Sequence, residues 1–258
     1  MFKFVKRWVV YIKLKGFSSA AIIITLIFSI AVIGLTIYGT KVGNFVVTIE
    51  ENTDISLLLC EKEDFVNKTP RLLANGLEDM TNCTISDLPI DAISRLDGSS
   101  SDDKYKSYFA YNFYIKNFSG IALNYEARIT IEEVFRDVDT ALRVMVVTDA
   151  HRYGINLDNT TMFTKLDSNG IAPPVYNVDH ISVPELRSLT MTNVFFDDPA
   201  YGNKYTICKF WVDGFKVNQI MKYTLIMWLE GEDENCTDDL LGGKIKMEMK
   251  FLAEKRLT

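Results

Sequence analysis

The sequence predicts a mainly β protein, an antiparallel β-sandwich of jelly-roll type on a single N-terminal transmembrane helix. Three observations predict it: an uncharged apolar run near the start, repeated short runs of β-branched and aromatic residues after it, and no long stretch with a 3.6-residue period. Strands that do not alternate with long helices favour an antiparallel sheet. Eight to ten of them in about 200 residues favour two packed sheets.

The apolar run covers residues 17–38 and reads FSSAAIIITLIFSIAVIGLTIY. As a helix it would be roughly 33 Å long, enough to cross a hydrocarbon core of about 30 Å. Five lysines and arginines and no acidic residue precede it, so the positive-inside rule predicts a cytoplasmic N-terminus. We expect residues 1–16 to be a cytoplasmic interfacial segment, 17–39 a transmembrane signal-anchor and 40–258 an extracellular domain.

A cleaved secretory signal is the alternative interpretation of this run. Such signals have a shorter apolar segment, of about 7–15 residues, that ends in a small-x-small cleavage site. Residues 35–39 (LTIYG) offer no good site of this kind. The preceding segment, FKFVKRWVVYIKLK, mixes basic and bulky apolar residues as an interfacial helix does. The sequence therefore predicts an uncleaved anchor, with the lipid bilayer as a partner.

The charge of the chain differs between its two parts. The whole chain carries −6 and the first 40 residues carry +5, which leaves −11 on residues 41–258. An acidic domain argues against nucleic acid as a partner, because nucleic-acid binding needs a basic surface. Apolar residues recur throughout the region, so it can form one folded domain with a core of its own.

All four cysteines, Cys60, Cys83, Cys208 and Cys236, lie in the predicted extracellular part. An even number of cysteines outside the cytosol favours disulfides, and three connectivities are open. Proximity along the chain mildly favours Cys60–Cys83 and Cys208–Cys236, with free buried thiols as the alternative. A zinc site is not indicated, since the sequence has no CxxC and neither histidine is near a cysteine.

Alternating or β-rich runs predict the strands. They are residues 45–50, 55–60, 108–116, 122–134, 143–148, 205–212, 223–230 and 244–252. In the last, Ile245, Met247, Met249 and Phe251 share one face and are expected in the core. Asp213-Gly214 suits a two-residue hairpin turn. Residues 71–79 and 137–142 are the best short helices, and residues 97–103 read as a flexible loop by composition.

A resemblance follows from three blocks of sequence. Residues 39–49 (GTKVGNFVVTI), 108–147 (YFAYNFYIKNFSGIALNYEARITIEEV, then DVDTALRVMVV) and 222–251 (KYTLIMWLEGEDENCTDDLLGGKIKMEMKF) resemble blocks in uncharacterised membrane-anchored surface proteins of Gram-positive bacteria. More distantly, the pattern is similar to the camelysin/TasA-like jelly-roll proteins. The resemblance implies a β-sandwich on the cell surface, and it carries no catalytic residues over to this chain. TasA-like proteins are typically released by signal cleavage, whereas this chain is expected to stay anchored.

Catalytic patterns are absent from the sequence. Zinc hydrolases need about three ligands and a general base, but the chain has only His151 and His180 and no HExxH. There is no GxSxG and no glycine-rich phosphate loop. Five sequons occur, at Asn67, Asn82, Asn117, Asn159 and Asn235. We therefore expect a protein that is not an enzyme.

The acidic loop EGEDENCTDD, residues 230–239, is the most concentrated chemical feature. Carboxylates in one turn can ligate Ca²⁺, so Glu232, Asp233, Glu234, Asp238 and Asp239 are the candidate ligands, although their order does not match an EF-hand. The alternative is a solvated loop that contributes little to stability.

The function expected from these observations is non-enzymatic: structural, adhesive or assembly contacts at the cell surface, with envelope or matrix proteins as partners. The alternative is an extracytoplasmic ligand- or metal-sensing module. A cytoplasmic part of about 16 residues cannot signal alone, so sensing would require a membrane partner.

Overall fold

The structure is a computed structural model, and it describes residues 24–29, 45–50, 56–76, 80–102, 104, 106–149, 160–181, 193–199 and 204–255. The chain divides into two compact units, Met1–Val42 and Gly43–Thr258. In the first unit, residues 24–29 are α-helical. No helix within the described ranges is both long and apolar enough to cross a membrane. The predicted segment 1–16 and most of the predicted span 17–39 lie outside the described residues.

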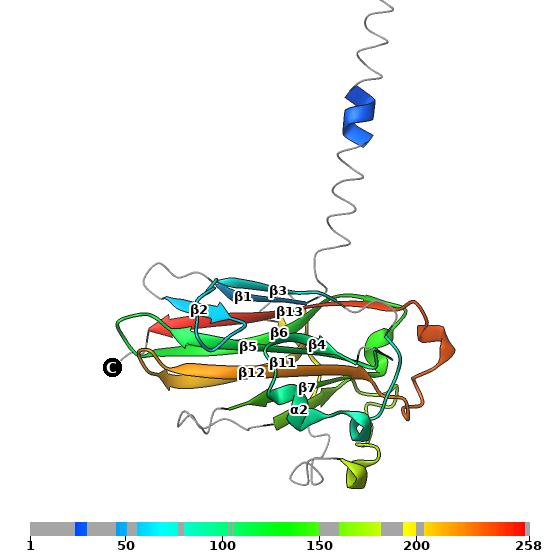
Figure 1. The fold of residues 1–258 in the computed structure, drawn as a ribbon. Helices are drawn as coiled ribbons and strands as arrows, with labels where there is room; N and C mark the ends of the chain where they lie inside the picture. Colours follow the sequence, from blue (N-terminus) through cyan, green and yellow to red (C-terminus); the bar gives the residue numbers. More distant parts are fainter. Residues whose placement is uncertain are drawn as a thin grey trace, which may run out of the picture. The chain divides into compact units, whose positions relative to one another are not determined.

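The second unit is built from two sheets, whose strands are labelled in Figure 1. The first sheet has the order β10-β11-β6-β13-β1-β3, with β10 Phe196–Asp198, β11 Lys204–Phe215, β6 Leu123–Phe135, β13 Lys244–Lys255, β1 Phe45–Glu50 and β3 Arg71–Ala74. The second has the order β2-β5-β12-β7-β8-β9, with β2 Leu57–Cys60, β5 Tyr108–Asn117, β12 Ile220–Leu229, β7 Leu142–Thr148, β8 Thr160–Thr164 and β9 Asn193–Val194. A further strand, β4 Gly98–Ser101, also pairs with β5. The expectation of a mainly β fold with two sheets is confirmed.

The sheets are not wholly antiparallel. β1 runs parallel to β13, with Phe45 opposite Met247 and Ile49 opposite Phe251. β8 and β9 are also parallel. Every other strand pair within the described ranges is antiparallel.

The main core lies between the two sheets and takes one face of the longer strands. In β13, Met247, Met249 and Phe251 are buried there, and Ile245 is partly buried against them, as the alternation predicts. Phe251 contacts three other aromatic rings, those of Phe113, Tyr125 and Tyr223. Within this core the Tyr125 and Tyr223 hydroxyls form a 3.0 Å hydrogen bond with each other, which satisfies both buried groups.

A second apolar cluster covers the outer face of the second sheet. It contains Trp228 from β12, Tyr108 and Ala110 from β5 and Met145 from β7, and it is closed by residues of two short helices. These are η1 Ile85–Asp87 and α2 Ile90–Ser94, and α2 is drawn beside β7 in Figure 1. The second sheet is therefore buried on both faces. This explains how β12 buries Trp228 on one face and Leu225 and Met227 on the other.

Two segments differ from the sequence-based expectations because tertiary pairing overrides local composition. Residues 71–79 were expected to be helical, but Arg71–Ala74 forms β3, which pairs with β1 at the edge of the first sheet. The serine-rich stretch expected to be a loop forms β4, because β5 offers it a strand edge. Of the other predicted helix, only the 3₁₀ turn η2 Val138–Thr140 is present.

The Asp213-Gly214 pair is not a hairpin turn. β11 continues through it with a register shift between Val212 and Phe215, and Gly214 has a φ of 66°. The N–H of Gly214 donates to the Asn124 side chain at 2.9 Å, so the extra residue of this bulge is satisfied locally. The turn between β11 and β12 comes later, where the Gln219 N–H donates to the Lys216 carbonyl at 3.0 Å.

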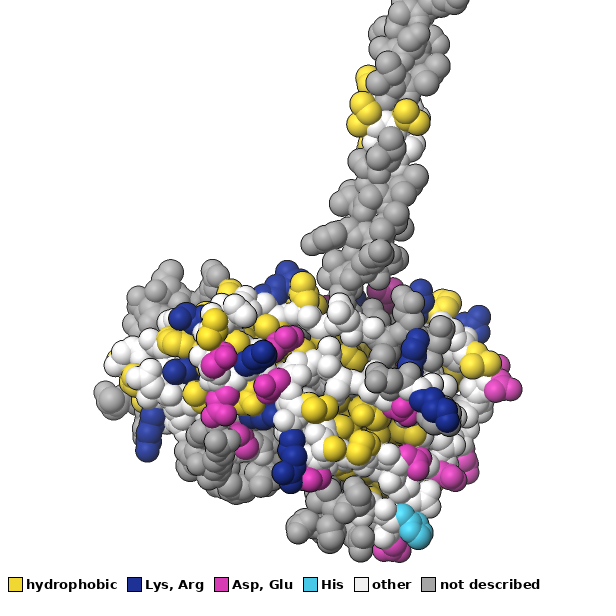
Figure 2. Space-filling view, in the orientation of Figure 1, with side chains coloured by type: hydrophobic (Ala, Val, Ile, Leu, Met, Phe, Trp, Pro, Cys, Tyr) yellow, Lys and Arg dark blue, Asp and Glu magenta, His cyan; other side chains and the backbone are white. Residues whose placement is uncertain are grey.

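Charged side chains also lie on the outer face of the first sheet. Arg128 and Glu126 on β6 form a buried ion pair, and Lys209 on β11 lies 3.2 Å from Glu126 and 3.6 Å from Asp198. In Figure 2, which shows one face of the molecule, basic and acidic side chains are interspersed around apolar patches. The described side chains on this face therefore carry charges of both signs.

Candidate functional site: the acidic loop and its buried arginine

The acidic loop begins where β12 ends and leads to β13. It folds through two successive tight turns, in which the Asp233 N–H donates to the Glu230 carbonyl at 3.2 Å and the Cys236 N–H donates to the Asp233 carbonyl at 2.8 Å. A 3₁₀ turn, η7 Asp238–Leu240, follows. The loop is therefore a compact hydrogen-bonded structure and not an extended solvated excursion.

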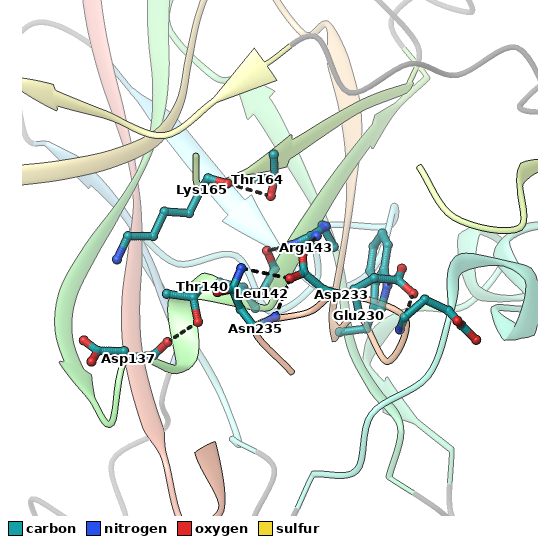
Figure 3. Close-up of polar contacts among 11 residues, drawn as sticks. Asp137, Thr140, Leu142, Arg143, Thr164, Lys165, Glu230, Asp233 and Asn235 are labelled. Atoms are coloured by element: carbon teal, nitrogen blue, oxygen red, sulfur yellow. Dashed lines mark hydrogen bonds and ion pairs between the residues drawn. The ribbon is translucent and has the colours of Figure 1, made fainter. Parts of the chain in front are cut away.

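Asp233 points from this loop into the protein. Its carboxylate accepts a hydrogen bond from Nη2 of Arg143 on β7, and the side chains of the two residues are 2% and 1% exposed. The other carboxylate oxygen accepts from the backbone and side-chain nitrogens of Asn235, at 2.8 and 2.9 Å. Figure 3 shows the Asp233 carboxylate between the Arg143 and Asn235 side chains. Both oxygens of Asp233 are thus used within the fold.

Glu230 supplies a second buried carboxyl group beside this pair. It is 2% exposed, and one of its oxygens accepts a 3.0 Å hydrogen bond from the indole Nε1 of Trp228. Burial raises the pKa of Glu230 above its usual value, and the hydrogen bond from Trp228 and the charge of Arg143 only partly oppose this effect. The Glu230 N–H donates to the Ala141 carbonyl at 2.9 Å, which ties the start of the loop to β7.

The remaining candidate calcium ligands, Glu232, Glu234, Asp238 and Asp239, are exposed. No three or more His, Cys, Asp or Glu residues come together to hold a metal ion anywhere in the described ranges, which include all five candidates. The expectation that the whole loop is solvated is wrong for Asp233, because that carboxylate is buried against Arg143. Its role here is structural.

The four cysteines are free thiols in the structure. Cys60 lies in a small cluster with Phe65 and Tyr114, and Cys208 lies in the main core. Cys83 packs against the second apolar cluster, while Cys236 lies in the acidic loop. The expected pairs Cys60–Cys83 and Cys208–Cys236 are therefore not formed, because each joins two separate regions of the fold.

The sequon at Asn117 and the two histidines noted in the sequence lie outside the acidic loop. Asn117, the third sequon, is fully buried, and its side-chain nitrogen donates to the carbonyls of Ile121 and Phe215 at 2.9 and 3.0 Å. It is the last residue of β5, held by hydrogen bonds to two backbone carbonyls, and not an accessible glycan acceptor. His180 is exposed in η4 Val178–His180, while His151 and Asn159 lie outside the described residues.

The residue that sequence reasoning missed is Arg143. The available signal was a charged side chain within an otherwise apolar strand, LRVMVV, whose neighbours are buried on both faces. A buried arginine needs an anionic partner, and a search for that partner would have drawn attention to the acidic loop. Which of its carboxylates was the partner depended on the fold.

Comparison with known proteins adds no assignment, since no protein-family model, curated protein or solved structure matches this chain.

Proposed function

We propose that this chain is a non-enzymatic protein of the cell surface, anchored by residues 17–39, whose β-sandwich makes structural, adhesive or assembly contacts with envelope or matrix proteins. The basic start and the uncharged apolar run of the sequence support the anchored topology. The net charge of −11 on residues 41–258 suits a domain that faces water and does not bind nucleic acid.

The observation that carries this proposal is the use of the acidic loop. The densest group of carboxylates in the sequence supplies Asp233 as a buried partner for Arg143, and Glu230 as an acceptor for Trp228. The two buried carboxylates of the loop therefore hold β7 and β12 to it. The second sheet is buried on both faces, and the contacts of Asp233 and Glu230 hold its end to the loop. Such a sheet is suited to displaying a rigid surface.

Loss of the chain from its own cell provides the test. Deleting the gene should impair surface adhesion, matrix formation or envelope integrity, and expression of the full chain should restore the phenotype. Rescue of the phenotype by an Arg143→Ala variant that reaches wild-type abundance would show that surface display suffices without the ion pair between Arg143 and Asp233. Normal adhesion, matrix and envelope after deletion would contradict the proposal. Co-purification of a membrane kinase or transporter would instead favour a sensing role.

A further inference from the structure

Two segments that carry cysteines meet at the end of β12. Cys83 forms a backbone bridge with Glu230: its N–H donates to the Leu229 carbonyl at 3.0 Å, and its carbonyl accepts from the Gly231 N–H at 2.9 Å. The preceding residue, Asn82, reaches over the loop, where its side-chain nitrogen lies 3.5 Å from the Cys236 sulfur. The segment around Cys83 therefore contacts the last residue of β12 at one point and the acidic loop at two.

Glycine at position 231 fits this close approach. A Cβ atom built there would lie 3.4 Å from Cγ of Asn82, at the near limit of ordinary van der Waals contact. The two tight turns that follow Glu230 then bring Cys236 back toward Asn82. The loop is thus packed against the segment that holds Cys83.

The register of the strands separates the other cysteines from this place. Cys60 is opposite Tyr114 on β5, whereas Trp228, just before the bridge to Cys83, is opposite Tyr108 on the same strand. Tyr114 and Tyr108 are six residues apart along β5, which corresponds to roughly 20 Å at about 3.3 Å per residue. A disulfide needs Cα atoms less than about 7 Å apart, so Cys60 can pair with neither Cys83 nor Cys236.

Cys208 is excluded by its place in the core. It lies between the sheets, on the inner face of the second sheet, whereas Cys83 packs against the apolar cluster on the outer face of that sheet. Cys60 and Cys208 face opposite sides of the second sheet, so they cannot pair with each other.

We propose that Cys83 and Cys236 are a redox pair that forms a disulfide when the chain meets an oxidising environment, fastening the segment over Trp228 to the acidic loop. The oxidant is a small-molecule or protein disulfide. The Cys236 thiolate attacks one of its sulfurs and releases one thiol. The Cys83 thiolate then attacks the Cys236 sulfur and releases the second thiol, so that two electrons pass to the oxidant and two protons leave the cysteines.

The free-thiol structure defines what this reaction must change. The Cys83 thiol donates to the Ser107 carbonyl at 3.3 Å, so its side chain must turn away from Ser107 and the Asn82 amide must leave the Cys236 sulfur. Burial, with the charges of Asp87 and Glu230, also raises the pKa of Cys83 to about 12, which slows exchange at neutral pH. The bond should therefore form over hours with oxidised glutathione and faster at alkaline pH.

The experiment uses the full-length chain, purified in reduced form and incubated with oxidised glutathione. Free thiols are then blocked with N-ethylmaleimide under denaturing conditions, and the digest is analysed by mass spectrometry without reduction. The expected product is a single cross-linked peptide pair that joins residues 83 and 236, with Cys60 and Cys208 alkylated. The melting temperature should rise by several degrees on oxidation, because the bond closes a loop of about 150 residues.

Matched variants make the result decisive. Cys236→Ser changes a half-buried loop position and should leave Cys83 alkylated and the melting temperature insensitive to oxidant. Cys60→Ala should leave the cross-link intact. Alkylation of both Cys83 and Cys236 in the wild type after prolonged oxidation, or a cross-link from either of them to Cys60 or Cys208, would overturn the proposal.

Discussion

The guanidinium of Arg143 on β7 donates to the carboxylate of Asp233 in the loop after β12, and both side chains are almost fully buried. The two residues are 90 positions apart in the sequence, so the contact fixes the loop to a strand that precedes it by far. A buried pair of this kind is costly to break, because the remaining charge has no solvent to compensate it.

Replacing Asp233 by Ala should therefore lower the free energy of unfolding by about 3–5 kcal/mol. Glu234→Ala, an exposed neighbour in the same loop, is the matched control and should change it by less than about 0.5 kcal/mol. Urea denaturation of both variants gives the comparison. Adding Arg143→Met to Asp233→Ala should recover part of the loss, and a double mutant as unstable as the sum of its parts would argue against the pair.

Phe251 tests the core between the sheets. It is fully buried and contacts three aromatic rings, so Phe251→Ala should cost roughly 3–5 kcal/mol of unfolding free energy. The control is Phe135→Ala at the end of β6, since Phe135 is 54% exposed. Equal losses in the two variants would show that Phe251 is not the core residue described above.

Several of these features could be predicted from the sequence. Strands with one exposed and one buried face, such as β13, were predicted correctly, because the alternation of polar and apolar residues directly indicates which side chains are buried. The segments that were missed, β3 and β4, carry no strand pattern of their own: β3 consists of arginine, leucine and alanine, which favour helix, and β4 of glycine and serine. Each forms a strand where a partner strand presents an unpaired edge. Composition along the chain carries no information about that edge.

The candidate site was only partly predictable for the same kind of reason. The sequence identified the acidic loop as the main chemical feature, but it could not distinguish the buried Asp233 from the exposed Glu234. That difference depends on Arg143, which reaches the loop through the pairing of β7 with β12. The burial of Trp228 could not be predicted from the sequence either, because nothing local shows that η1 and α2 cover the outer face of its sheet.

The pH dependence of stability should report on Glu230. Because its pKa is raised in the folded protein, the fold binds this proton more tightly than the unfolded chain does. The stabilisation is present below the usual pKa and is lost as the pH rises through the raised value. Glu230→Gln keeps an oxygen for Trp228 and removes the charge, so it should melt above the wild type near about pH 7 and close to it near about pH 4. A variant that melts lower at neutral pH would contradict this account.

Calcium should have little effect on stability. With both oxygens of Asp233 engaged by Arg143 and Asn235, the remaining exposed carboxylates lack a buried ligand to build on. Melting curves in calcium and in chelator should therefore coincide. A rise of several degrees in calcium that disappears in an Asp238→Asn, Asp239→Asn double variant would make the loop a metal site.

The most direct measurement for the proposed function is the accessibility of the β-sandwich on intact cells. Protease added outside should remove nearly all of the mass of the full-length chain and leave a small membrane-bound stub that contains the apolar run 17–38. Antibodies to the two ends of the chain would identify the fragments, and a cytoplasmic protein would serve as the control for cell integrity. Full protection of the C-terminal domain while lysed cells allow its digestion would contradict surface display.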